Sequence, residues 1–106
     1  MGKYVLIAQS AAKDGQDDEY NKWYGGTHLP DICAIPGVKS GRRFELAMVP
    51  HGHPGLRYLA IYEVEVDDPA SVMAEIGKRM SNGTMKISEA LDADPTVMWF
   101  YKLREE

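Results

Sequence analysis

Three features common in other classes of protein are missing from this sequence. Cys33 is the single cysteine, so no disulfide can form within the chain. No apolar run approaches the length that spans a bilayer, and only five apolar residues precede Gln9 after Lys3, too few for a signal-peptide core. The net charge of −4 argues against a nucleic-acid-binding surface. We therefore expect a cytoplasmic protein that binds neither nucleic acid nor membrane.

The common motifs of cofactor and nucleophile chemistry are also missing. There is no phosphate loop, no dinucleotide fingerprint and no nucleophile elbow. His51 and His53 flank a glycine, but no carboxylate or cysteine beside them completes a metal site. Cys33 has no base near it and is interpreted as a small core residue. The sequence predicts that any chemistry proceeds without a metal or cofactor.

The periodicity of apolar residues predicts one α+β domain over residues 1–106. The expected elements are a strand at 3–9, a helix from about 19 to before Pro36, strands at 38–47 and 57–66, a helix at 69–80, a short helical turn at 84–92, and a strand at 96–103. This β-α-β-β-α-β order predicts the ferredoxin-like fold, an antiparallel sheet with both helices on one face.

Several local features set the expected boundaries and burial. Asp17 and Asp18 are suited to capping the first helix. Pro69 suits the first turn of the second helix, which should bury Met80 on its packed side with other apolar residues. The second half of strand 38–47 should be more buried than the first.

The expected strands are apolar on both faces, although one face of an antiparallel sheet usually meets water. Consecutive apolar residues occur at 5–8 (VLIA), 58–62 (YLAIY) and 97–101 (VMWFY). A chain of this size has no further element to cover the second face. We therefore predict a homodimer that pairs sheet against sheet.

One block of the sequence resembles a known family. Residues 23–30 (WYGGTHLP), residues 35–38 (IPGV) and the pair Arg43-Phe44 resemble the EthD-like branch of the dimeric α+β barrel superfamily. The resemblance implies a dimer whose two sheets form a barrel, with a small apolar pocket between the sheet and the helices of each subunit. The wider group includes cofactor-free isomerases, lyases, cyclases and oxygenases acting on aromatic or polyketide-like compounds, and members without known activity.

The block around His28 has the composition of a site. Tyr24 and His28 lie four residues apart and share a helix face. Gly25 and Gly26 open the backbone to close approach, and Pro30 removes an N–H from the helix beside the histidine. The resemblance places His28 at the pocket. The alternative is a structural role, in which His28 packs on the sheet with both nitrogens satisfied.

Six further residues are candidates for binding a substrate: Trp23, Tyr24, Asp31, Arg43, Tyr58 and Tyr62. Asp31 could accept a hydrogen bond from His28 and fix its tautomer. Arg43 could hold a carboxylate or phenolate, or form a surface ion pair with Glu45 or Glu63. The two strand tyrosines could donate hydrogen bonds into the pocket or simply pack in the core.

Two classes of function remain open on the sequence. The first is a cofactor-independent enzyme of isomerase, lyase or cyclase type, with His28 as general acid or base on an aromatic or polyketide-like molecule. The second is a non-catalytic binder or accessory protein for an apolar metabolite. A cofactor-free oxygenase is a further alternative.

Overall fold

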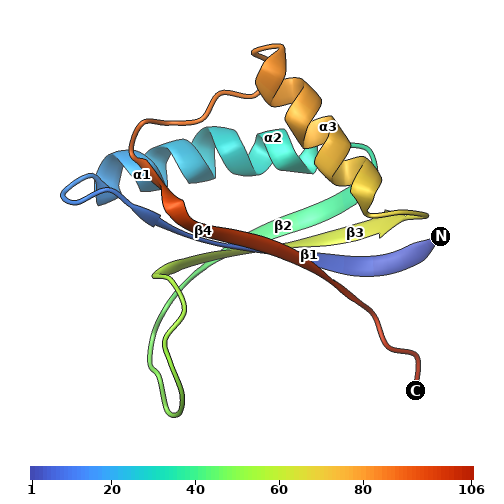
Figure 1. Cartoon of the computed structure of the whole chain (residues 1–106), viewed down its shortest axis with the longest axis horizontal. Coiled ribbons are helices and arrows are strands. Elements are labelled where there is room, and N and C mark those ends of the chain that lie inside the picture. Colours follow the sequence, from blue (N-terminus) through green and yellow to red (C-terminus); the bar gives the residue numbers. More distant parts are fainter.

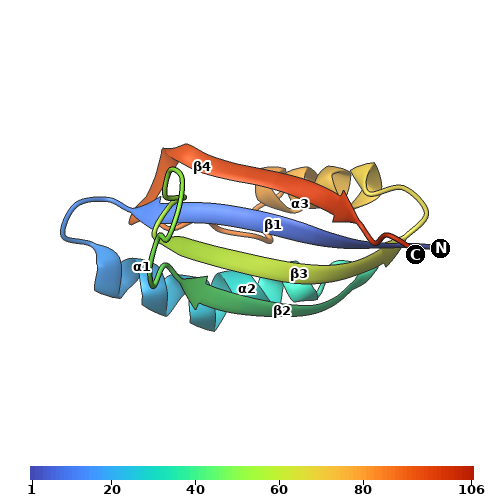
Figure 2. The same ribbon diagram turned by 90° about the horizontal axis from the view of Figure 1, so that it is seen from below.

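The computed structural model describes all 106 residues as a four-stranded antiparallel sheet with its helices on one face (Figure 1). The elements are β1 (Gly2–Ala12), α1 (Asp17–Trp23), the π-helix η1 (Tyr24–His28), α2 (Leu29–Cys33), β2 (Val38–Glu45), β3 (Tyr58–Val66), α3 (Ala70–Ser81) and β4 (Leu91–Lys102). The sheet order is β2-β3-β1-β4, so the predicted ferredoxin-like arrangement is confirmed (Figure 2). None of the helices is long and apolar enough to cross a membrane.

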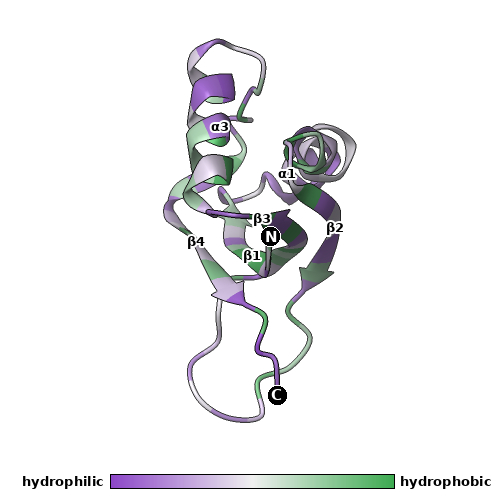
Figure 3. Ribbon diagram, turned by 90° about the vertical axis from the view of Figure 1, so that its right-hand side faces the viewer, coloured by the Kyte–Doolittle hydropathy of each residue, from purple (hydrophilic) through white to green (hydrophobic).

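Strand alternation divides the sheet into a helix-covered face and an open face. Leu6 and Ala8 of β1 are buried beneath the helices. Their neighbours across β3, Tyr62 and Ala60, are buried on the same side. The continuous rod α1–η1–α2 lies along the β2 side of this face and α3 along the β4 side (Figures 2 and 3).

The open face carries apolar side chains that nothing in the chain covers. Ile7 lies between Ile61 on β3 and Trp99 on β4. Trp99 is 38% exposed and Phe44 on β2 is 47% exposed. The expectation that the second half of strand 38–47 is more buried is therefore wrong for the single chain, because β2 is an edge strand and Phe44 lies on its open face. The β2–β3 loop and the C-terminus project on this side (Figure 1).

The last strand begins earlier than its sequence suggests, and the predicted helical turn at 84–92 is wrong. Pro95 lies inside β4 rather than before it. Pairing with β1 is interrupted between Asp92 and Val97, so the proline occupies a bulge on an edge strand, where a missing N–H is tolerated. Residues 82–90 are irregular instead, with Met85 and Ala90 buried.

The predicted caps are also displaced. Asp17 lies in the first turn of α1, whose N-cap is Gln16, and no side chain caps that end. Pro69 is the N-cap of α3, and the carboxylate of Asp68 accepts the N–H of Ala70. Met80 is 48% exposed rather than packed, since only Val72 and Ile76 of α3 are fully buried.

Candidate functional site

The rod widens into a π-helix where the sequence predicted a loosened helix. The N–H of Leu29 donates to the carbonyl of Tyr24, five residues earlier. Pro30 has no N–H to give to the carbonyl of Gly26, so the regular four-residue pattern cannot continue through this point. Such single-turn widenings occur frequently at functional sites.

His28 closes this segment and lies between two aromatic rings. Its imidazole stacks on Trp23, with ring centroids 4.6 Å apart and an interplanar angle of 22°. It makes an edge-to-face contact with the ring of Tyr24, with ring centroids 4.8 Å apart and an interplanar angle of 86°. The Trp23 indole is fixed in turn, because its Nε1 donates to the carbonyl of Lys86 at 3.1 Å. The histidine ring is therefore held in place by packing.

One nitrogen of His28 has no partner. Nδ1 is the single buried side-chain nitrogen or oxygen in the chain without a hydrogen bond. Burial lowers the pKa of His28 to about 4, and the nearby charge of Asp31 only partly opposes this effect. The imidazole is therefore neutral at pH 7. The predicted bond from Asp31 to the ring does not form, because Nδ1 is unpaired.

The two imidazole nitrogens of His28 differ in their surroundings. Nε2 is not among the buried unpaired atoms, and His28 as a whole is half-buried. In a neutral imidazole one nitrogen carries the proton and the other a lone pair. With Nδ1 enclosed, Nε2 is the atom that can exchange a proton with a ligand or with solvent.

Tyr24 and Tyr62 pair behind the histidine. Their hydroxyl oxygens lie 3.1 Å apart and both rings are buried. Burial raises the pKa of Tyr24 to about 12. Burial also raises the pKa of Tyr62, and the neighbouring Tyr24 adds to that effect. Both phenols are neutral. Their hydroxyls form a hydrogen bond with each other and do not donate into an open pocket.

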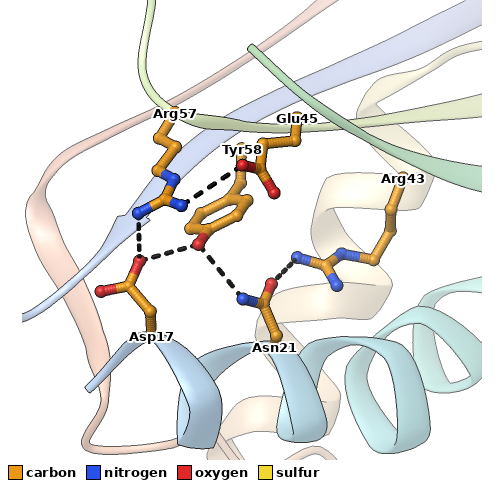
Figure 4. A network of polar contacts seen from close by, with 6 residues as sticks. All are labelled: Asp17, Asn21, Arg43, Glu45, Arg57 and Tyr58. Carbon is orange, nitrogen blue, oxygen red and sulfur yellow. Dashed lines mark hydrogen bonds and ion pairs between the residues drawn. The ribbon is translucent and has the colours of Figure 1, made fainter. Parts of the chain in front are cut away.

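A second polar cluster involves Arg43, which sequence reasoning assigned to either a ligand or a surface ion pair (Figure 4). Arg43 Nη2 donates to Asn21 Oδ1 at 2.7 Å. Asn21 Nδ2 donates to the Tyr58 hydroxyl at 3.1 Å, and that hydroxyl donates to Asp17 at 2.7 Å. The predicted ion pair with Glu45 or Glu63 is wrong. Glu45 pairs with Arg57 at 3.3 Å instead.

The guanidinium of Arg43 lies over tyrosine rings. Its central carbon is 4.7 Å from the ring centroid of Tyr24 and 5.6 and 5.7 Å from those of Tyr20 and Tyr58. Cation–π contacts of this kind are attractive. Arg43 and His28 therefore both contact the ring of Tyr24.

The structure brings some predicted site residues together and separates others. Trp23, Tyr24 and His28 form one cluster with Tyr62 behind it, whereas Tyr58 joins Arg43, and Asp31 makes no bond to either group. Sequence reasoning missed Asn21 and the role of Asp17. Their spacing held a signal, since residues 17, 21 and 25 are four apart and share one helix flank.

A cleft of about 530 Å³ lies away from these residues. It is open to solvent between the start of β1, the end of β3 and the C-terminal residues. Lys3, Glu63 and Tyr101 are among its lining residues, and none of the predicted site residues lines it. Tyr24 and Tyr62 are buried between sheet and helices and do not line this cleft, so the pocket implied by the resemblance does not coincide with it.

The fold belongs to a class with solved representatives. One is an ethyl tert-butyl ether D (EthD) family protein from Bacillus halodurans, with a TM-score of 0.62, 19% identity, and coverage of 96% of this chain and 99% of that one. Another is a protein of Arabidopsis thaliana, with a TM-score of 0.59 and 18% identity; the match covers 100% of this chain and 98% of that one. No family model and no curated protein matches the sequence.

The predicted resemblance to EthD proteins is thus confirmed as a structural match. The whole chain takes part in it, including both helices and the four strands. At these identities the match establishes a shared fold and leaves the reaction open.

Proposed function

We propose that this chain is a small, cofactor-independent, EthD-like enzyme of isomerase, lyase or cyclase type. His28 acts as its general acid or base on an aromatic or polyketide-like molecule. The observation that carries the proposal is the unpaired, buried Nδ1 of His28. A buried polar atom without a partner costs on the order of 1–3 kcal/mol, and such atoms in native proteins call for an explanation such as a catalytic role.

The proposed chemistry uses the neutral imidazole. Nε2 takes a proton from a carbon or oxygen next to a carbonyl or phenol and returns it at another position. The stack on Trp23 and the edge contact with Tyr24 keep the ring from turning between the two steps. A flat, conjugated substrate suits an aromatic surrounding of this kind.

Two substitutions test the role of His28. His28→Ala and His28→Gln should each lower the turnover of a substrate, found by mass spectrometry of molecules that copurify with the protein, by about 10²–10⁴-fold. His51→Ala is the matched control, since His51 is exposed in a loop, and it should leave turnover unchanged. Full activity in His28→Gln would refute the proposed proton transfer.

We also propose that the open sheet face is covered by a second copy of the chain. The row Trp99–Ile7–Ile61 is apolar, and Phe44 and Tyr101 on the same face are 47% and 60% exposed. Monomers rarely expose large contiguous apolar patches. The projecting β2–β3 loop is on the side where a partner would lie (Figure 3).

Sedimentation at micromolar concentration tests the dimer. The wild type should sediment at twice the chain mass of 11.8 kDa. Trp99→Lys should produce the monomer, because it places a charge in the buried sheet pairing. Met80→Lys, at an exposed apolar residue of α3, should remain dimeric. A monomeric wild type would contradict the pairing.

The alternative, a non-catalytic binder of an apolar metabolite, is favoured by one observation. The pKa of about 4 makes His28 a weak base at neutral pH, whereas general bases work best with pKa values near the working pH. A binder would retain its copurifying molecule and its affinity in His28→Gln, and that molecule would be unchanged after long incubation with the wild type.

A further inference from the structure

Two arginines, Arg43 in β2 and Arg57 just before β3, have different polar partners. Arg57 forms ion pairs with Asp17 at 3.1 Å and with Glu45 at 3.3 Å. Arg43 has no carboxylate partner, and its hydrogen bond goes to the neutral amide of Asn21. A half-buried guanidinium without a counter-ion is unusual, because buried charges are normally paired.

Arg43 is nevertheless held in one position. Asn21 is fixed by Tyr58, and Tyr58 by Asp17, so the chain of hydrogen bonds sets the direction of the guanidinium (Figure 4). The guanidinium also makes cation–π contacts with three tyrosine rings. Because the single buried unpaired nitrogen or oxygen is in His28, none of the Arg43 nitrogens without a hydrogen bond is fully enclosed. A preorganised cation with free donors is the arrangement that binds carboxylates bidentately.

The backbone leaves a way to these donors. Gly25 and Gly26 are exposed. A Cβ at Gly25 would come within 3.9 Å of Arg43 Nη1, whereas a Cβ at Gly26 would meet nothing within 4 Å. The missing side chain at position 25 therefore uncovers the guanidinium.

We propose that Arg43, Asn21 and the Gly25 backbone form a second binding site, which takes a small molecule with a carboxylate group. The fork of the guanidinium holds the carboxylate, and the flat part of the ligand lies over Gly25.

This site is separate from that of His28. Asn21 and Gly25 are four residues apart on one flank of the rod, and Trp23 is about 200° around the helix from Asn21. Trp23 donates a hydrogen bond to Lys86, in the segment between α3 and β4. Arg43 instead lies on β2, the edge strand at the opposite end of the sheet from β4. The ring of Tyr24 contacts both His28 and Arg43, so the two sites share one side chain and no donor.

Benzoate and benzamide provide a shape-matched test by NMR titration of ¹⁵N-labelled protein. Both have the same flat shape, but only benzoate carries the anion. We expect saturable shifts of the Arg43 guanidinium signals with benzoate and none with benzamide. Absence of saturation with benzoate at millimolar concentration, or equal binding of the two compounds, would overturn the proposal.

Variants separate recognition from structure. Gly25→Ala should weaken the binding of benzoate several-fold. Gly26→Ala, the matched control, should bind benzoate as the wild type does. Arg43→Gln should weaken it at least about tenfold. Arg43→Lys keeps the charge over the rings but loses the fork, so the fold should persist while affinity falls. Unchanged affinity in both Arg43 variants would overturn the site. His28→Gln should leave benzoate binding intact, which keeps this test independent of the proposed enzyme.

Discussion

The two successive parts of the first helical rod differ in one buried polar group. In α1 the polar side chains facing the sheet are paired: Asp17 with Tyr58 and Arg57, Tyr20 with Ser10, and Asn21 with Tyr58 and Arg43. In η1, which follows directly, the Tyr24 hydroxyl pairs with that of Tyr62, but His28 Nδ1 is enclosed without any partner. Polar groups that serve the fold are satisfied, so the comparison identifies η1 as the part of the rod that the fold alone does not explain.

The largest expected effect on stability concerns His28 and pH. Its pKa in the folded chain is about 4 and its ordinary value is 6.5. Between these values the unfolded chain binds a proton that the folded chain excludes, so the free energy of unfolding falls as the pH is lowered from about 6.5 to about 4. The difference is on the order of 3 kcal/mol. Urea denaturation at several pH values measures it.

His28→Phe sharpens that measurement. Phenylalanine keeps the aromatic stack on Trp23 and removes both nitrogens, so the variant should lose most of this pH dependence. At pH 7 it should be as stable as the wild type or more stable, because replacing an unsatisfied polar group by an apolar one of similar shape is neutral or stabilising. A structural histidine with satisfied nitrogens would instead lose stability in this variant.

Tyr20→Phe, in α1, should lower the free energy of unfolding, whereas His28→Phe should leave it unchanged or raise it. Tyr20 and Ser10 are buried and bonded to each other, so removing the phenol hydroxyl strands the serine. The expected loss is about 1–3 kcal/mol, measured by chemical denaturation. Adding Ser10→Ala to the same chain should restore part of it. A neutral Tyr20→Phe would remove the distinction between the two stretches.

Replacing either glycine of η1 by alanine should stabilise the chain. Neither Gly25 nor Gly26 has a positive φ, and a Cβ at either position meets nothing closer than 3.9 Å. Alanine at each position should therefore raise the free energy of unfolding by about 0.5–1 kcal/mol. Thermal denaturation compares the two variants, and a destabilising Gly26→Ala would show that the π-helix itself requires glycine.

The smallest effect is expected in the β2–β3 loop. His51 and His53 are exposed, so replacing both by alanine should change stability by less than about 0.5 kcal/mol. Metal content measured by elemental analysis should also be unchanged. The loop is held at its two ends, where Leu46 N–H donates to the carbonyl of Arg57 at 2.8 Å and Leu56 N–H donates to Gln9 Oε1 at 2.9 Å. A metal lost with the two histidines would contradict this prediction.

The order of elements could be predicted because it rests on local signals. Apolar periodicity located both helical segments and all four strands, and α3 ends at Ser81, one residue beyond the expected end and shortly before Gly83 at φ 81°. Pro95 gave a misleading local signal, because an edge strand can hold a proline in a bulge. Whether a strand is an edge strand depends on its neighbours in the sheet and is not visible locally.

The site could be predicted only in part. The composition around His28 indicated an opened helix, and Trp23 and Tyr24 do contact the imidazole. The partner of Arg43 could not be predicted, since strand register and helix placement decide that it meets Asn21 rather than Glu45. The bond expected from Asp31 failed for a similar reason: closeness in sequence does not fix the direction of two side chains on a widened helix.

The most direct test of the central claim is an NMR titration of the His28 imidazole nitrogens in the wild-type protein. If His28 is held neutral and without a partner, as the comparison of η1 with α1 requires, its pKa should lie near 4, and Nδ1 should show no hydrogen-bond partner at pH 7. His51 and His53, exposed in the same chain, provide internal reference signals. A pKa for His28 at or above the ordinary 6.5, or a hydrogen-bonded Nδ1, would mean that the histidine is part of the architecture and would contradict the account.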